Sequence, residues 1–163
     1  MRIICVVGRS KSGKTALIER LVPELKKKGL RIAVIKHDPH DRFEFDREGK
    51  DSWRFKKAGA DAIAISSPKR IGIIMDVDHD HSLEELSVFF DVDLIIAEGY
   101  KRSKYPKIEV IKKGHSPLLR RDELIAVVSE EDLDLGVPRF SFQQIKELAE
   151  FILTNENNIN FSP

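Results

Sequence analysis

The feature that most restricts the fold of this chain is the octapeptide Gly8-Arg-Ser-Lys-Ser-Gly-Lys-Thr15, which has the pattern G-x-x-x-x-G-K-S/T. It follows the apolar run 3–7 and precedes an amphipathic segment that starts at Lys14. A buried strand, a glycine-bearing loop and a helix in this order are typical of phosphate-binding α/β proteins. The sequence therefore predicts a strand, loop and helix that bind a nucleoside triphosphate with magnesium.

Each residue type in the octapeptide has a physical role. Gly8 and Gly13 let backbone N–H groups point at a phosphate, because a side chain at either position would intrude. Lys14 is predicted to reach the β and γ oxygens, and the Thr15 hydroxyl to bind magnesium. A chance match in a structural turn is the alternative, and the flanking strand and helix patterns argue against it. The rest of the loop consists of Arg9, Ser10, Lys11 and Ser12.

Length and charge predict an ordinary single domain. The 163 residues include 28 basic and 27 acidic side chains, so the net charge of +1 gives no general attraction to nucleic acid. We expect one domain over residues 1–154 and a polar, frayed tail at 155–163. Cys5 is the only cysteine, which rules out an internal disulfide. Because no apolar run is long enough for a signal peptide or membrane span, we expect a cytoplasmic protein.

Strand and helix patterns alternate at the start of the chain, which predicts a parallel sheet. The apolar run 3–7 is followed by a helix over about 14–28 and a second strand over 31–36. Pro23 lies inside this helix, and we expect it to kink or break the helix there. The predicted fold is the three-layer α/β fold of the P-loop NTPases, with a mostly parallel central sheet.

The later elements include one antiparallel pair. Two β-rich runs within about 61–76 are separated by only three residues, which permits a hairpin but no crossover helix. A capping box at 82–85 predicts a helix that continues through Phe89 and Phe90, and a second at 141–144 begins the last helix. Further strands are predicted at 94–97, 108–111 and 125–129.

Glu98 is the predicted partner of the phosphate loop. It ends the strand 94–97, and ligands of open α/β sheets bind at the carboxyl ends of the strands. Asp93, at the other end of the same run, would lie at the opposite edge. We therefore assign Glu98 to positioning magnesium or water, with a solvated loop acid as the alternative. Lys14 and Glu98 are the candidates for a catalytic role.

The segment 37–52 leaves the same sheet edge and is rich in side chains that can coordinate a metal. It could bind a metal, order around a γ-phosphate as a mobile switch, or form a polar loop. The stretch 76–81 has a similar composition, and a solvated turn is its favoured interpretation. The coordinating side chains of the first segment are His37, Asp38, His40, Asp41 and Asp46.

The rest of the ligand is less well defined by the sequence. The base-reading tetrapeptide N-K-x-D is absent, so guanine cannot be assigned from residues alone, and the loop 129–132 is the candidate for contacting the base. Basic side chains could hold an anionic substrate, or form an ordinary charged surface. These side chains are Arg102, Lys104, Lys107, Arg120 and Arg121.

In their order and spacing, these motifs resemble the molybdopterin-guanine dinucleotide biosynthesis protein B family, called MobB. The resemblance spans about residues 1–130 and is much more specific than the phosphate loop alone. The segments that carry it are Gly8 to Thr15, Lys36-His37-x-x-His40, Asp46, Gly49-Lys50-Asp51-Ser52, Ala58-Gly59-Ala60 and Glu98-Gly99-Tyr100-Lys101.

The resemblance implies a cytoplasmic, dimeric GTP-binding protein with weak GTPase activity. Such a protein would assist the molybdopterin guanylyltransferase, the partner enzyme that attaches GMP to molybdopterin. Carried over residue by residue, the octapeptide would hold GTP, and Lys101 would lie near the nucleotide. The stretch 76–81 and the tail depart from the family pattern, so no partner docking is inferred there. The residues that would face magnesium are Thr15, Glu98 and Asp46.

Two other functions remain open from the residues. One is a small-molecule kinase that holds ATP in the same loop, with Arg120 and Arg121 closing over the transferred phosphoryl group. The sequence has no long lid insertion, which argues against this function. The other is a metallochaperone GTPase, suggested by four histidines: His37, His40, His79 and His81.

Overall fold

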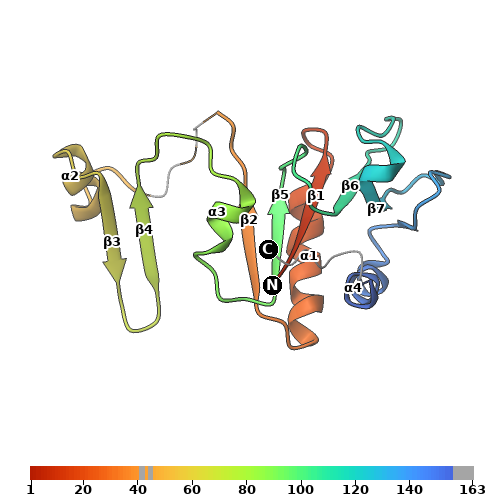
Figure 1. Ribbon diagram of the computed structural model, residues 1–163, viewed down its shortest axis with the longest axis horizontal. Coiled ribbons are helices and arrows are strands. Elements are labelled where there is room, and N and C mark those ends of the chain that lie inside the picture. Colours follow the sequence, from red (N-terminus) through yellow and green to blue (C-terminus); the bar gives the residue numbers. More distant parts are fainter. Residues whose placement is uncertain (41–42, 44–45, 156–163) are drawn as a thin grey trace. The chain divides into compact units, whose positions relative to one another are not determined.

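The computed structural model describes residues 1–40, 43 and 46–155, and this part of the chain divides into two compact units. The first combines Met1–His37 with the chain from Leu83 onward, and the second is Asp38–Ser82. Figure 1 labels most of their helices and strands. No described helix is both long and apolar enough to cross a membrane. The predicted frayed tail falls almost wholly on residues 156–163, which lie outside the described residues.

A parallel sheet forms the centre of the first unit. Among the described residues it has six strands in the order β2-β5-β1-β6-β7-β8, and each neighbouring pair is parallel (Figure 1). All its strands therefore end at the same edge, where open α/β sheets bind ligands. The strands are β1 (Arg2–Gly8), β2 (Ile32–Lys36), β5 (Leu94–Glu98), β6 (Lys107–Val110), β7 (Leu124–Val128) and β8 (Arg139–Phe140).

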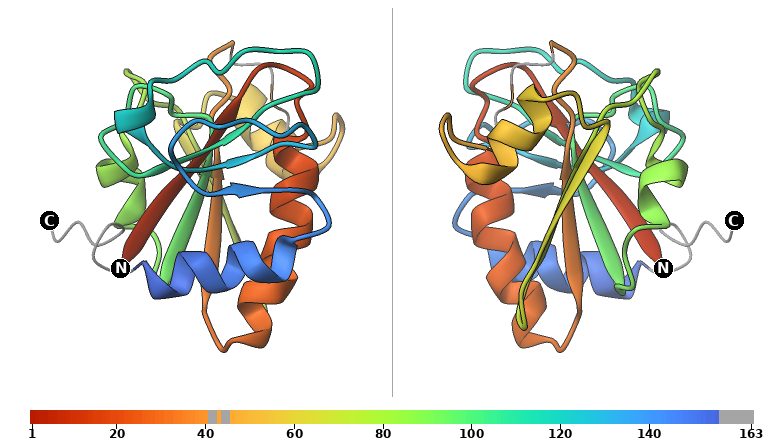
Figure 2. Two further views of the ribbon diagram at one scale, coloured as in Figure 1. Left: turned by 90° about the vertical axis from the view of Figure 1, so that its right-hand side faces the viewer. Right: turned by 90° about the vertical axis from the view of Figure 1, so that its left-hand side faces the viewer.

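Alternating side chains give this sheet two apolar faces. On β1, Ile4 points to one face and Cys5 to the other, and both are fully buried. The face of Ile4 packs against α1 (Lys14–Lys27) and α4 (Ile145–Thr154), and the other packs against α3 (Leu83–Ser87). Figure 2 shows α1, in orange, and α3, in green, on opposite sides of the strands. This is the predicted three-layer α/β fold.

α1 continues through Pro23 without a break, which was one of the two predicted outcomes, and the predicted kink is not tested. A proline inside a helix removes one backbone donor and leaves the carbonyl four residues earlier, here that of Glu19, without its partner. Pro23 and Glu19 are both exposed, so water can bond this carbonyl. The packing of the opposite face outweighs the lost bond. That face consists of the fully buried Leu17, Leu21 and Leu25.

α3 is shorter than predicted. It ends at Ser87, whose hydroxyl donates a hydrogen bond to the carbonyl of Glu84 at 2.8 Å. Beyond it, the N–H groups of Phe89 and Phe90 bond to carbonyls three residues back, as in turns rather than an α-helix. Both phenylalanines are exposed. These two side chains therefore do not belong to the buried face of a helix. The prediction was wrong because it took their apolar character and spacing as evidence for such a face.

The second unit contains the predicted antiparallel hairpin. It consists of β3 (Ala62–Ser66) and β4 (Ile71–Met75), preceded by α2 (Asp51–Lys57). Lys56 on α2 forms an ion pair with Asp76, just after β4. This pair ties the short helix to the end of the hairpin.

Candidate functional site

The loop between β1 and α1 has no room for a side chain at either glycine. Gly8 has a φ angle of +148°, and a β-carbon there would lie 2.5 Å from the carbonyl oxygen of Val110 and 2.6 Å from Ser12 Oγ. Gly13 has a φ angle of +101°, and its β-carbon would lie 3.0 Å from Cζ of Phe142. Both glycines are therefore required by backbone conformation and by space.

Ser12 carries a buried hydroxyl inside this loop. The residue is only 8% exposed, and its Oγ has no hydrogen-bond partner among the described residues. Such a buried hydroxyl costs about 1–3 kcal/mol unless a partner satisfies it. Lys11 has a φ angle of +58°, which curls the chain at this point. The curled backbone, the two closed glycine positions and the buried hydroxyl fit a phosphate group.

Lys14 bends back over the loop, and its Nζ donates a hydrogen bond to the carbonyl oxygen of Arg9 at 2.9 Å. Burial is the main cause that lowers the pKa of Lys14 below its usual value. The carboxylate of Glu98 opposes this shift, while Lys101 and Lys36 add to it. A phosphate anion would favour the charged form of Lys14, so the lysine is suited to binding one.

Thr15 and Glu98, two of the predicted magnesium residues, lie together in the structure. Thr15 Oγ1 donates a hydrogen bond of 2.9 Å to Glu98 Oε2. The pairing of β1 with β5 explains the contact, because it places Val6 opposite Glu98 and so brings the carboxylate next to the start of α1. A hydroxyl and a carboxylate are oxygen ligands of the kind that magnesium prefers.

Lys36 is a site residue that was not among the predicted binding residues. It ends β2 directly opposite Glu98 on β5, so both side chains leave the same face of the sheet. Lys36 and Lys101 both act electrostatically on Lys14, as does the Glu98 carboxylate, and we call Lys14, Lys36 and Lys101 the lysine cluster. The position of Lys36 at the carboxyl end of a predicted strand was the signal that could have identified it.

The turns after β2 and β5 are held to each other. His37 donates its backbone N–H to the carbonyl of Glu98 at 3.1 Å, and its ring lies 4.9 Å from that of Tyr100. A β-carbon on Gly99 would lie 3.3 Å from the β-carbon of His37. In the first unit, His37 is thus a packing residue that supports the turn bearing Glu98.

Asp46 and His40 belong to the second unit, and their contacts there are local. Asp46 accepts the backbone N–H of Arg47 at 2.8 Å, and the N–H of His40 bonds to Asp38 at 3.1 Å. The other carboxylate oxygen of Asp46 is buried with no partner among the described residues. A magnesium role for Asp46 stays a prediction. Asp41 lies outside the described residues.

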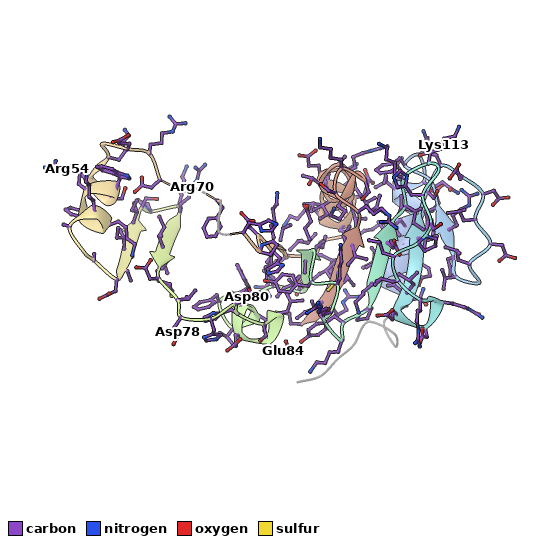
Figure 3. The ribbon with its side chains drawn as sticks, turned by 90° about the horizontal axis from the view of Figure 1, so that it is seen from above. Arg54, Arg70, Asp78, Asp80, Glu84 and Lys113 are labelled. Carbon is purple, nitrogen blue, oxygen red and sulfur yellow. The ribbon has the colours of Figure 1, made fainter. Side chains whose placement is uncertain are left out.

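The stretch 76–81 also makes contacts within itself. The rings of His79 and His81 stack at 4.3 Å, and His79 Nδ1 lies 2.6 Å from a carboxylate oxygen of Asp78. Asp78 and Asp80 lie on the segment between β4 and α3 (Figure 3). Within residues 1–40, 43 and 46–155, no group of three acidic, histidine or cysteine side chains is placed to hold a metal. These contacts are those of a polar turn.

The later basic residues make contacts with their own surroundings, and their role as an anion cradle stays a prediction. Four of the five are held by contacts with their own surroundings, and Arg102 is exposed. The four contacts are Lys104 with the Glu84 carboxylate, Lys107 with the carbonyl of Tyr105, Arg120 with the Asp122 carboxylate, and Arg121 with the carbonyl of Gly136.

Comparison with known proteins gives consistent matches. The sequence matches the family model of MobB, molybdopterin guanine dinucleotide synthesis protein B, over residues 3–130. A molybdopterin-guanine dinucleotide biosynthesis adapter protein of Haemophilus influenzae is 36% identical over 155 residues, which cover 92% of this chain and 86% of that protein. The Escherichia coli protein of the same name is 33% identical over 163 residues, with coverages of 93% and 91%.

A solved structure is similar over nearly the whole chain. It is a crystal structure of molybdopterin-guanine biosynthesis protein B, with a TM-score of 0.75 and 32% sequence identity. The similarity covers 95% of this chain and 99% of the other. The range matched by the family model, residues 3–130, includes the phosphate loop, the middle segment and Glu98.

Proposed function

This chain belongs to the molybdopterin guanine dinucleotide synthesis protein B family, and on that basis we propose that it is a GTP-binding accessory protein with weak GTPase activity. Its place is in molybdenum cofactor biosynthesis. There, in the cytoplasm, it would assist the molybdopterin guanylyltransferase that attaches GMP to molybdopterin. The observation that carries the nucleotide-binding part is the hydrogen bond between Thr15 and Glu98 at the mouth of the phosphate loop.

The loop residues would hold the phosphates of GTP. The backbone N–H groups of the loop and the first turn of α1 offer donors to an anion, and the helix dipole adds to their attraction. The Ser12 hydroxyl would find its partner in a phosphate oxygen. Lys14 would exchange its bond to the Arg9 carbonyl for bonds to the β and γ oxygens. In both states Lys14 donates hydrogen bonds to oxygen atoms, so the loop need not refold when GTP binds.

Magnesium would be held by Thr15 and, directly or through water, by Glu98. When bound, the ion neutralises phosphate charge and polarises the γ-phosphate toward attack. Glu98 also balances part of the positive charge of the lysine cluster. Lys36 and Lys101 would then face the charge on the outer phosphates.

The proposal is tested by measuring GTP and ATP affinity with magnesium and with EDTA, for the wild type and for Glu98→Ala. Magnesium should strengthen GTP binding to the wild type, and Glu98→Ala should lose about tenfold or more of that gain. In EDTA the variant should bind GTP as well as the wild type or better, because the lysine cluster loses its balancing carboxylate.

Asp93→Asn is the matched control, since it changes a carboxylate at the other end of the same strand and should leave both affinities unchanged. If magnesium increases the GTP affinity of Glu98→Ala as much as that of the wild type, Glu98 is not part of the metal site. Stronger binding of ATP than of GTP, with phosphorylation of an acceptor, would instead support the kinase.

We also propose that the protein is a homodimer and that the hairpin takes part in the interface. Ile65, Ile71 and Ile73 are 55%, 72% and 55% exposed. In the described part of the chain, β3 and β4 pair only with each other, and a two-stranded hairpin is marginally stable by itself. A second copy covering these isoleucines would remove apolar surface from water and supply a partner for a free strand edge.

Ile71→Lys should weaken this dimer by about tenfold or more, because it places a charge in an apolar contact. Sedimentation equilibrium measures the dissociation constant. Val88→Lys is the control, since Val88 is 78% exposed in the first unit and outside the hairpin. An unchanged dimer in Ile71→Lys would place the interface elsewhere.

A further inference from the structure

Two further loops open at the sheet edge that bears the phosphate loop. In the sheet, β6, β7 and β8 follow β1 in that order and run parallel to it. The loop after β7 begins at Ser129, and the loop after β8 covers 141–144. A nucleotide with its phosphates on the first turn of α1 can therefore extend its base either toward these loops or toward β2.

Phe142 joins the loop after β8 to the phosphate loop. Its ring lies against Gly13, so close that a β-carbon on the glycine would come within 3.0 Å of Cζ. The backbone N–H of Phe142 donates a hydrogen bond of 2.9 Å to Oε1 of Glu130. Phe142 thus connects the carboxylate of Glu130 with Gly13, the residue that precedes Lys14.

The backbone that carries Glu130 is held firmly. Ser129 is fully buried, and its N–H donates to the carbonyl of Phe140 at 2.9 Å. The carbonyl of Ser129 accepts a hydrogen bond from the Arg139 guanidinium at 3.3 Å. Glu130 itself is exposed, so its second oxygen, Oε2, is accessible to a ligand. A carboxylate on a fixed backbone can accept hydrogen bonds from a ligand in a defined orientation.

We infer that Glu130 is the residue that recognises guanine, an inference that rests on the proposed GTP binding. Guanine presents two neighbouring donors on its pairing edge, N1–H and the 2-amino group, and a carboxylate only accepts. Charge-assisted hydrogen bonds of this kind are the stronger ones. Adenine presents an acceptor at N1, which the same carboxylate repels, so Glu130 would select against ATP.

The charges on the two sides of the phosphate loop favour this direction for the base. The side toward β2 carries Lys36 and Lys101, whose ammonium groups are donors and would repel the donors of guanine. They suit the outer phosphates. The side toward β7 carries Glu130 next to Gly13. The buried hydroxyl of Ser12, which has no hydrogen-bond partner in the described part of the chain, belongs to the loop that would hold the phosphates.

Glu130→Gln tests the inference, because the amide keeps one acceptor for the Phe142 N–H and turns the other oxygen into a donor. The probes are GTP, ATP, ITP, which lacks the 2-amino group, and XTP, which has a carbonyl there. Glu130→Gln should weaken GTP binding by about tenfold and tighten XTP binding by a similar factor. Its preference for GTP over ITP should disappear.

Asp134→Asn is the matched control, an exposed carboxylate just beyond this loop that accepts the Gly136 N–H at 3.3 Å. It should leave the GTP to XTP ratio at the wild-type value. A GTP-selective wild type whose selectivity survives Glu130→Gln would overturn the inference and leave the proposed function standing. Equal binding of GTP and ATP by the wild type would also overturn it. A wild type that binds no triphosphate would overturn both.

Discussion

Lys14→Ala is expected to lower the affinity for GTP by about 100-fold or more while leaving the fold intact. Truncating one partner of a desolvated charge pair costs about 2–5 kcal/mol, and each 1.4 kcal/mol is a factor of ten. Lys14 is partly buried in the loop, which strengthens its interaction with an anion. Isothermal titration with GTP and magnesium measures the effect.

The fold should survive this change, because the shorter of the two hydrogen bonds that Lys14 donates goes to the exposed carbonyl of Arg9, which water can serve, and the other, to the carbonyl of Gly8, is long at 3.4 Å. We expect the free energy of unfolding to change by about 1 kcal/mol or less. Lys26→Ala is the control, an exposed lysine at the other end of α1 that should leave GTP binding unchanged. If Lys14→Ala binds GTP like the wild type, the octapeptide is not the phosphate site.

Gly8→Ala is expected to lower the free energy of unfolding by about 3 kcal/mol and to abolish GTP binding. The new β-carbon would lie 2.5 Å from the carbonyl oxygen of Val110, a backbone atom of β6 that cannot move away without disturbing the sheet. The φ angle of +148° adds backbone strain. Urea unfolding and GTP titration of the same preparation measure both effects.

Gly29→Ala separates the two causes. Gly29 also has a positive φ angle, +88°, but a β-carbon there would meet nothing within 4 Å. Strain alone should cost about 1 kcal/mol and leave GTP binding intact. If Gly8→Ala lowers the free energy of unfolding no more than Gly29→Ala does, the loop does not approach β6 as closely as described.

Predictions that rested on short stretches of sequence fared best. The strand before the octapeptide, the helix after it and the hairpin all lie within about a residue or two of their expected positions. The patterns were less reliable where a local rule competed with packing. Pro23 sits within α1 because the buried leucines on the opposite face outweigh one lost hydrogen bond. Phe89 lies beyond α3, because an apolar residue at helical spacing need not face a core.

For the candidate site, the sequence identified the groups but not all of their neighbours. Thr15 and Glu98 were predicted together, since both follow from the rule that ligands bind at the carboxyl ends of parallel strands. Lys36 was not predicted to bind, because its place opposite Glu98 depends on β2 being the strand next to β5. Phe142 occupies a variable position of the predicted capping box at 141–144, and only its contact with Gly13 shows its role.

By itself, then, the sequence determined the octapeptide, the elements around it and the acid that ends β5, because loop conformation and helix initiation depend on residues close together in the chain. The tertiary structure decided which side chains meet. The order of strands brings Glu98 to Thr15, Lys36 to Glu98 and the loop of Glu130 to the phosphate loop. Such contacts join residues far apart in sequence, and they depend on the packing of the whole sheet rather than on any local pattern.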